Sequence, residues 1–536
     1  MYDRPPGLSS SAAPFVTVKV MAPAPPETPH RSQRFLHSVL WSWFGVAVSI
    51  FSGILLAPYI VHKLGDVGSG VWVLIFSLVD NFGMIDLGFR SATLKYTAHY
   101  RATGELHKVN ETLNTAIFFS GTVCLLTVCA TLLFASAITR FEHISPEYAK
   151  TFTVLLIIVG IGWASGAVFN LFSACLEGFQ RFDLTSRIWI VQIAIRTLGI
   201  AAVLASGHGM FAMGMVVIAA LVSTYTLNLL AVRRVFPQLK ISPSYLSYGM
   251  FRQMLHYGVH TFGATISQQI LNQSAPLLIA HFLPSTAFVN YYKQPLNLLQ
   301  YSVDMVGRVG FVTGSHSAEL AAKKNYESVA RMGIFINRYC FTLFAPLAMA
   351  LIVYGSELFR VYLNPTFAAM DAPLFPVLAV GITLGIAAQF NSSAILYGLG
   401  KHQGYAYSLM VEAALCLAGL SWAVPHYGIL GAAWVTSTLM LLNRGLVTSW
   451  LVCRAIHYNV WSYLRGIYVL PLVVAIPVLL MSFWVKRHWI PGNNLVQVLG
   501  GGALLAITYY AIAFFVVMEK EHRALPVNWL RARLRM

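Results

Sequence analysis

Three charged residues lie within one otherwise apolar segment, "NYYKQPLNLLQYSVDMVGR", at residues 290–308. They are Lys293, Asp304 and Arg308. On a helix these residues and Asn297 fall on one face, because residues three or four positions apart are neighbours there. Ammonium and guanidinium groups both bind phosphate, lysine as a point charge and arginine as a bidentate fork. The spacing therefore predicts a helix with a polar stripe that can bind an anion.

The polar stripe has two interpretations. A charge that faces lipid costs ~2.5–3.5 kcal/mol even on the lenient insertion scale, so the stripe must face protein or water. It can line a cavity, or Asp304 and Arg308 can form a structural ion pair one turn apart. Lys293 has no acidic residue within one turn, and the neighbouring Pro295 can bend the helix. Lys293 is therefore the stronger ligand candidate, whereas Arg308 can also serve as an anchor at the membrane surface.

A second charged group lies earlier in the chain. Asp86 and Arg90 are four residues apart, a spacing at which they can satisfy each other as an internal ion pair. Asp80 lies nearer the middle of the same apolar segment and has no such partner. We expect Asp80, Lys293 and Asp304 to form a network across a cleft that rearranges between states.

Uncharged amides gather in "SQQILNQS", at residues 267–274. They are Gln268, Gln269, Asn272 and Gln273. Amides at this depth suit the hydroxyl groups of a sugar, and they suit hydrogen bonds between helices equally well. Both interpretations stay open from the sequence.

Four further charged residues lie within apolar segments: Arg196, Arg338, Glu412 and Arg444. Each lies within a few residues of an inner end of its segment or can extend its side chain to the membrane surface. Glu412 and Arg444 are predicted to form a buried pair.

The composition is typical of a protein with many membrane spans. Of the 536 residues, 57% are hydrophobic and 10% are charged, against about 25% charged in soluble globular chains. The mean hydropathy is +0.66. The six cysteines lie in apolar runs without metal-ligand spacing, and no phosphate-binding loop or paired catalytic motif occurs. The sequence predicts an all-α integral membrane protein with no cofactor, no metal and no enzymatic activity.

Fourteen apolar segments are long enough to cross a membrane, since a span needs about 20 mostly apolar residues. With the amino terminus inside, inner segments hold 26 lysines and arginines and outer loops hold six. This asymmetry predicts cytoplasmic termini, and it assigns the net charge of +17 to topology and membrane lipids with no nucleic-acid partner. The predicted spans are residues 38–62, 70–98, 110–138, 151–176, 187–207, 210–232, 255–281, 286–312, 332–356, 372–397, 403–424, 428–453, 464–485 and 494–518.

The two halves of the chain share an arrangement. Residues 55–90 and 277–310 each contain an apolar helix, a short polar turn, an aromatic residue and a second helix with an acid and a base. Both begin on a span that runs from inside to outside, so the repeat is parallel, with its axis along the membrane normal. The expected parts are a disordered cytoplasmic tail (1–35), an N-lobe of six spans (36–232), a cytoplasmic connector (233–254), a C-lobe of six spans (255–453), two further spans (454–518) and a basic cytoplasmic tail (519–536).

The segments "LAPYIVHKLG" and "GVWVLIFSLVDNFGMIDLGFRSATLKYTAHY" resemble the start of polysaccharide flippases in the multidrug/oligosaccharidyl-lipid/polysaccharide exporter superfamily. The piece "IDLGFRSA", at residues 85–92, is the most specific, and the fourteen spans extend the resemblance over most of the chain. The resemblance implies two six-helix lobes around a central cavity. It also implies alternating access that carries an undecaprenyl-diphosphate-linked oligosaccharide to the outer leaflet of the bacterial cytoplasmic membrane.

Under this resemblance, Lys293 and Arg308 on one lobe and Arg90 on the other would attract the diphosphate headgroup from the cytoplasmic side. The glycan would serve the synthesis of O-antigen, capsule or exopolysaccharide. A polysaccharide polymerase and a chain-length regulator are the candidate protein partners.

Two other functions stay open. A cation-coupled multidrug antiporter of the same superfamily typically holds a carboxylate in the first, seventh or tenth span. Here the first and seventh contain no acid, and the tenth has only Asp371, at its outer edge. A membrane polysaccharide polymerase or ligase tends to place catalytic groups on a long outer loop, whereas the longest one here, at residues 357–371, has only Glu357, Arg360 and Asp371 as charges. An exporter of a lipid-linked glycan is therefore the leading interpretation, with its driving force open.

Overall fold

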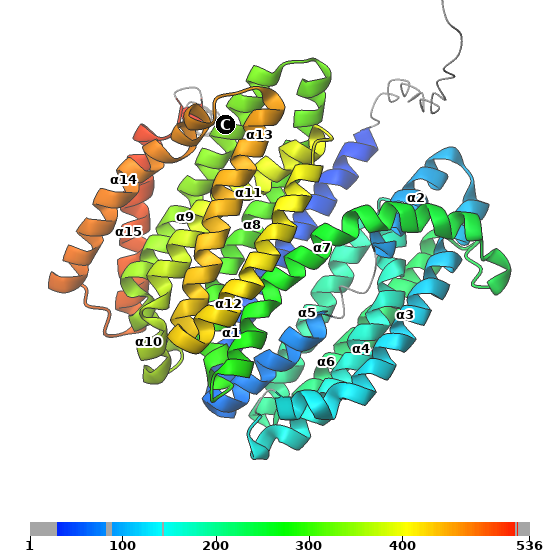
Figure 1. The fold of residues 1–536 in the computed structure, drawn as a ribbon, viewed down its shortest axis with the longest axis horizontal. Coiled ribbons are helices and arrows are strands. Elements are labelled where there is room, and N and C mark those ends of the chain that lie inside the picture. Colours follow the sequence, from blue (N-terminus) through cyan, green and yellow to red (C-terminus); the bar gives the residue numbers. More distant parts are fainter. Residues whose placement is uncertain (1–28, 82–87, 142–143, 520–521, 524–536) are drawn as a thin grey trace, which may run out of the picture.

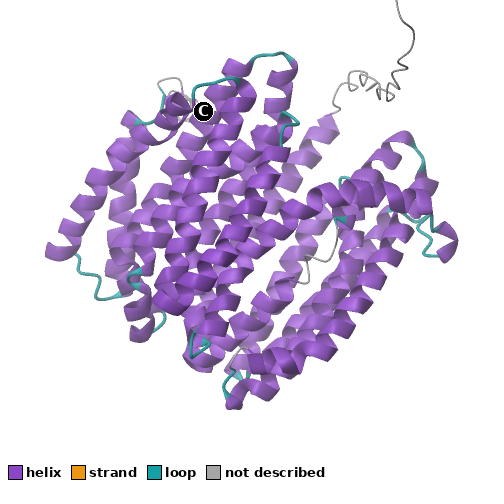
Figure 2. Cartoon of the chain, viewed as in Figure 1, coloured by secondary structure: helices purple, strands orange, loops and turns teal. Residues whose placement is uncertain are grey.

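The computed structural model describes residues 29–81, 88–141, 144–519 and 522–523. All regular structure in these ranges is helical, and they contain no strand (Figure 2). Asp86 lies outside the described residues, and so do the side chains of Asp304 and Arg308, whose main chain is helical. The predicted tails at residues 1–35 and 519–536 also fall mostly outside.

The first half of the chain forms six helices (Figure 1). They are α1 (Pro29–Val79), α2 (Phe89–Thr103), α3 (Leu106–Phe141), α4 (Pro146–Gly178), α5 (Phe182–Ala205) and α6 (Met210–Val235).

The second half begins with a short 3₁₀ turn and continues through nine α-helices and one π-helical segment. In order they are η2 (Pro243–Tyr245), α7 (Tyr248–Phe282), α8 (Ala287–Ala322), α9 (Tyr326–Tyr362), α10 (Pro365–Asp371), α11 (Leu374–Gly398), α12 (Gln403–Leu439), η3 (Met440–Val447), α13 (Thr448–Ile456), α14 (Val460–His488) and α15 (Leu495–Val516).

Two long helical stretches are each interrupted at a glycine. Helix α1 has 51 residues. At 1.5 Å per residue this is about 77 Å, more than twice the ~30 Å hydrocarbon core. Its path breaks at Gly65, whose φ of 72° lies in the left-handed region. The 54 residues at 403–456 break in the same way at Gly428, with φ of 60°. Glycine adopts such angles without a Cβ clash, so each break can be sharp.

The predicted spans all overlap helices of the structure. Within the described residues, nine helices are long and apolar enough to cross a membrane, or ten if α10 and α11, bent by 57°, form one broken span. Helices α7 and α8 are not among them, and both carry polar residues along their length. The chain is therefore a multi-pass membrane protein in which two long polar helices need protein or water around them.

The helices form two lobes (Figure 1). In the first lobe α4 packs on α3 and α6, and α5 packs on α1 and α6. In the second lobe α7 packs on α12, and α11 lies against both α8 and α9. Helices α14 and α15 lie against α9, at the outside of the second lobe. This confirms the predicted two-lobe architecture with two additional C-terminal helices.

Helices α1 and α8 form the main contact between the lobes. One buried apolar cluster crosses this boundary and includes Leu74 and Ile75 of α1 together with Val289 and Tyr292 of α8. One side of helix α8 therefore packs on the second lobe, to which it belongs, and a different side packs on the first lobe. A polar stripe on such a helix lies at the boundary between lobes.

Two asparagines of α3 hold the connector that joins the lobes. Asn110 donates to the carbonyl oxygen of Gln238 and accepts from the amide of Lys240, both at 3.0 Å. Asn114 donates to the carbonyl oxygen of Lys240 at 2.7 Å and accepts from the amide of Ser242 at 2.8 Å. Helices α6 and α7 both extend into the predicted connector, so the irregular part is shorter than expected. We call this side of the molecule the connector face, and the side with the two glycine breaks the far face.

Candidate substrate-binding cleft

A cavity of about 290 Å³ lies between the lobes, bounded by α1, α5, α6, α7 and α8. Its charged residues are Asp80 (directly after α1), Arg196 of α5 and Lys293 of α8. Amides and hydroxyls continue the polar wall, among them Ser52, Ser77, Gln273, Asn297 and Tyr301. The rest of the wall is apolar, with side chains such as Leu56, Ile60, Trp72, Phe76, Ile200 and Val217. We refer to this cavity as the cleft.

Lys293 lies on α8, which continues as a helix through Pro295. Its ammonium group makes no hydrogen bond or ion pair within the part of the chain that the structure describes, and Asp80 is the charge that acts on it. Burying a charge without a partner is costly, so an anion in the cleft would be bound favourably. Lys293 therefore lines the cleft, while its role as a ligand stays a prediction.

Amides of α7 hold Asp80 in place. The Nε2 atom of Gln273 donates to Asp80 Oδ2 at 3.2 Å, and Nε2 of Gln269 donates to the carbonyl oxygen of Asp80 at 2.9 Å. Next along α7, Gln268 donates to Asn272 at 3.3 Å. In this state Gln269 and Gln273 therefore make contacts between lobes, while Oε1 of Gln273 is buried without a partner among the described residues.

Arg196 is a cleft residue that sequence reasoning missed. From the sequence, Arg196 was expected to lie near the inner end of its span or to extend its side chain to the membrane surface. It lies well inside the 24-residue helix α5 and lines the cleft. Like Lys293, it has no hydrogen bond or ion pair within the described ranges, and the charge of Asp80 acts on it. Its depth in the span was the signal that could have identified it. The cleft thus holds two cations and one acid, a balance that favours an anionic ligand.

A second cavity, of about 240 Å³, shares Gln273, Lys293 and Asn297 with the cleft and extends among α7, α8, α11 and α12. Asn272 and Thr436 also line it. Its polar surface combines amides and hydroxyls with the charged residues Lys293, Glu412 and Arg444, so it offers hydrogen-bonding groups to a polar ligand next to the cleft.

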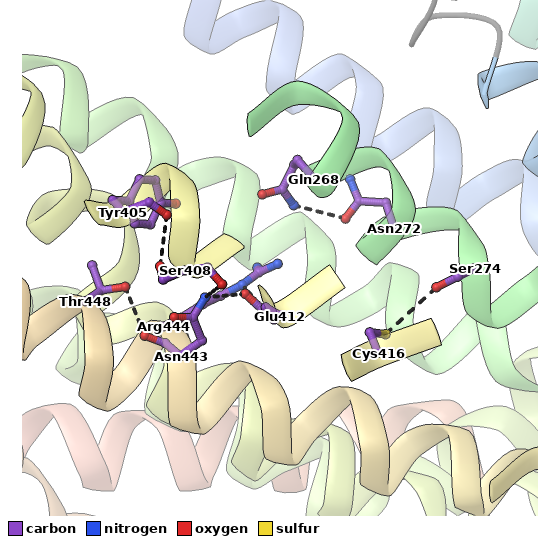
Figure 3. A network of polar contacts seen from close by, with 10 residues as sticks. All are labelled: Gln268, Asn272, Ser274, Tyr405, Ser408, Glu412, Cys416, Asn443, Arg444 and Thr448. Atoms are coloured by element: carbon purple, nitrogen blue, oxygen red, sulfur yellow. Dashed lines mark hydrogen bonds and ion pairs between the residues drawn. The ribbon is translucent and has the colours of Figure 1, made fainter. Parts of the chain in front are cut away.

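The predicted pair of Glu412 and Arg444 is confirmed, at one end of this second cavity. Arg444 Nε lies 3.3 Å from Glu412 Oε1, and Asn443 Nδ2 donates to Glu412 Oε2 at 2.7 Å (Figure 3). Only 7% and 2% of the Arg444 and Glu412 side chains are exposed. Asn443 and Arg444 belong to the π-helical segment η3, a widened winding that often occurs at functional sites. The pair neutralises two charges that would otherwise be buried alone.

Arg90 lines neither cavity. At the start of α2, its guanidinium donates to Glu177 of α4 at 2.7 Å. The partner predicted for it, Asp86, lies outside the described residues. The predicted roles of Arg90 as a cleft cation, and of Asp304 and Arg308 in the polar stripe, therefore stay predictions.

The lobes are in contact at the far face. Asn290 Nδ2 donates to Ser69 Oγ at 2.7 Å, and Thr286 Oγ1 donates to the carbonyl oxygen of Val67 at 3.2 Å. Gly70 lies so close to the main chain of Thr286 that a Cβ atom would not fit. These contacts close the far face in this conformation.

The chain is similar to proteins of polysaccharide export. Residues 35–309 match a family described as "Polysaccharide biosynthesis protein". A protein of Shigella flexneri whose name describes it as an O-antigen transporter is 21% identical over 416 residues, which are 77% of this chain and 97% of that protein.

Two solved structures have a similar fold. The lipid II flippase MurJ in an inward closed conformation has a TM-score of 0.69 and 12% identity, covering 90% of this chain and 100% of that one. A multidrug resistance MATE family transporter of the MOP superfamily, in an inward-facing conformation, has a TM-score of 0.60 and 12% identity, covering 81% of this chain and 99% of that one. These relatives agree with the expectation of a transporter and not with that of a polymerase or ligase.

Proposed function

Because the chain belongs to the family described as "Polysaccharide biosynthesis protein", we propose that it moves an undecaprenyl-diphosphate-linked oligosaccharide across the bacterial cytoplasmic membrane. The lipid-linked glycan enters the cleft from the connector face. The two lobes then reorient by alternating access, and the glycan leaves at the far face for the synthesis of O-antigen, capsule or exopolysaccharide.

One observation carries this proposal: Lys293 and Arg196 line the same cleft from opposite lobes, with no direct partner in the described part of the chain. A diphosphate group carries several negative oxygens, which can accept from an ammonium and a guanidinium at the same time. Since the two cations belong to different lobes, a bound diphosphate would couple binding to the relative position of the lobes.

Asp80 supports this role as an internal stand-in for the ligand. Its charge acts on both Lys293 and Arg196. Gln273, which belongs to the second lobe, donates from Nε2 to Asp80 Oδ2 at 3.2 Å. An incoming diphosphate would replace this single negative charge as the partner of the two cations. Lys293 and Arg196 would then interact with Asp80 before the substrate binds and with the diphosphate while it is transported.

The remaining surfaces suit the rest of such a substrate. The apolar side chains that line the cleft, such as Trp72 and Phe76, suit a prenyl chain. The second cavity offers amides and hydroxyls, including Asn272 and Thr436, to the hydroxyl groups of a sugar. A molecule with an apolar tail, a diphosphate and a glycan would contact the apolar wall, the two cations and the second cavity.

The orientation follows from the distribution of positive charge. The connector between α6 and α7 and its flanks carry Arg233, Arg234, Lys240 and Arg252. Such residues near anionic lipid contribute about 1 kcal/mol each, which favours their position on the cytoplasmic side. The connector face is then cytoplasmic, and both termini lie on the same side.

The competing function is a cation-coupled multidrug antiporter, because one similar fold belongs to a multidrug resistance transporter. Such an antiporter carries cationic substrates. The cleft has two positive side chains, Lys293 and Arg196, and one negative side chain, Asp80, so its net positive charge would repel them. The sign of the charge in the cleft therefore favours the anionic lipid.

Reconstitution into liposomes tests the proposal. A fluorescent undecaprenyl-diphosphate monosaccharide should become accessible to a membrane-impermeant quencher in the opposite leaflet, and a cationic dye should not be transported. Movement of the dye without movement of the diphosphate lipid would overturn the proposal.

A further inference from the structure

The short helix α10 is attached to both lobes at the far face. Asn364, which precedes it, accepts from the amide of Phe367 at 3.0 Å and donates to Asp66 Oδ1 of the first lobe at 2.8 Å. Tyr291 of α8 donates to the other oxygen, Asp66 Oδ2, at 2.7 Å. The rings of Tyr291 and Phe367 meet edge to face, with centroids 4.6 Å apart. One carboxylate of the first lobe thus holds α8 and α10 of the second.

The last residue of α10 is a buried acid without a partner. Asp371 has 0% of its surface exposed, and neither of its carboxylate oxygens has a hydrogen-bond partner among the described residues. An apolar buried cluster includes its chain neighbours Phe367, Leu374 and Phe375. An ionised carboxylate in such surroundings is so costly that the group takes up a proton instead.

The charged and titratable groups around α10 do not supply a counter-charge to Asp371. On the ends of α8 and α9 that lie toward α10, these groups are Tyr291 and Tyr292 of α8 and Tyr354, Glu357, Arg360 and Tyr362 of α9. Asp66 of α1 lies beyond them, and α11 has no charged residue. Glu357 pairs with Lys486 at 2.8 Å, and Arg360 donates to a main-chain carbonyl oxygen at 3.5 Å. Tyr291 is close enough to be affected by Asp371, but its hydroxyl donates to Asp66.

We propose that Asp371 is a proton-binding site that controls the far face. Its carboxyl holds a proton while the face is closed. Opening separates Asp66 from Asn364 and Tyr291 and lets water reach the end of α10. The O–H bond of the acid then breaks, the proton passes to water, and the carboxylate keeps the electron pair. A proton from the far side is required before the face can close again.

This site predicts the sign of the pH dependence. Acid should favour the closed far face, and the release of one proton on opening raises the open-to-closed ratio by up to about tenfold per pH unit. Protonation of Asp66 would act in the opposite direction, because it would weaken an acceptor for Asn364 and Tyr291. The direction of the response therefore separates control by Asp371 from control by Asp66.

The distance between spin labels at Lys150 and Tyr427 tests the site. Both residues are exposed and lie toward the far face, one in each lobe. The measurement uses the full chain without its native cysteines, in lipid and without substrate, at a series of pH values. The parent protein should show the short distance at acid pH and a growing population of longer distance as pH rises.

Three substitutions in the same background complete the test. Asp371→Asn should show the short distance at every pH, because the amide cannot ionise, and Asp371→Glu should retain the response. His62→Gln is the matched control, an exposed titratable residue near the Gly65 break, and should behave as the parent does.

Four results would each overturn the proposal. They are a parent without pH dependence, opening of the far face by acid, an unchanged response in Asp371→Asn, and a lost response in Asp371→Glu. No lipid substrate is present, so the outcome is independent of the proposed function.

Discussion

Gly70 of α1 lies against the main chain of Thr286 so closely that a Cβ atom at position 70 would overlap the carbonyl oxygen of Thr286. The two residues belong to different lobes. Helices α1 and α8 can therefore approach to this distance at the far face only because no side chain separates them. Gly70 thus lies at the contact between the lobes and lines neither cavity.

Gly70→Ala should shift the lobes toward the open far face. Overpacking of this kind costs about 1–3 kcal/mol, which lowers the closed-to-open ratio roughly fivefold to 150-fold. The distance between labels at Lys150 and Tyr427 measures this ratio. Gly121→Ala is the control, since a Cβ there meets nothing within 4 Å. An unchanged distance distribution in Gly70→Ala would show that the contact with Thr286 does not hold the face closed.

Arg196→Gln should weaken binding of a diphosphate lipid. A hydrogen bond to a charged group contributes about 1.5–3 kcal/mol, so the affinity should fall roughly tenfold to a hundredfold. Arg196→Lys should retain part of the affinity because it keeps the charge. Binding of undecaprenyl diphosphate to purified protein measures the effect, and Arg234→Gln, at an exposed arginine of α6, is the control. Equal affinities in parent and Arg196→Gln would remove Arg196 from the site.

Glu412→Gln should destabilise the second lobe. It leaves the buried guanidinium of Arg444 without its counter-charge, which costs about 3–5 kcal/mol. The double variant Glu412→Gln/Arg444→Met should recover most of the loss, because no buried charge then remains. Thermal unfolding in detergent, followed by size-exclusion chromatography, measures both variants. If the double variant were no more stable than the single one, the ion pair would not be the cause.

The proposed orientation predicts the side of each loop. Reporter fusions at Tyr248 and Asn325 should be cytoplasmic, and those at Pro146 and Asn364 should be periplasmic. The reason is the excess of lysine and arginine in the segments predicted to be cytoplasmic, 26 against six in the predicted outer loops. An inversion at any of the four positions would contradict the arrangement of the two halves.

The helices and their lobes could be predicted from the sequence because the physical signal is strong. Apolar segments of the length of a membrane predict spans directly, and the polar face around Lys293 predicted that α8 lies inside the protein. The pair of Glu412 and Arg444 followed from the same cost of a charge in lipid.

What the sequence could not supply was the choice among partners from distant segments. The spacing of Arg90 and Asp86 could suggest a local pair, but it could not indicate the contact of Arg90 with Glu177, 87 residues further along the chain. Arg196 could extend to the membrane surface or line a cleft, and only the packing of α5 on α1 decides between them. Local spacing indicates which residues need a partner, whereas tertiary packing determines which partner they find.

The central claim concerns Lys293, and the most direct test is translocation of the fluorescent undecaprenyl-diphosphate monosaccharide by Lys293→Ala in liposomes. The variant should fold and insert as the parent does, because removal of a charge without a direct partner lowers the desolvation cost. Translocation should nevertheless be abolished, while Lys293→Arg retains some activity and Lys150→Ala, at an exposed lysine of α4, retains all of it. Full translocation by Lys293→Ala, at equal protein content, would contradict the account of the cleft as a diphosphate site.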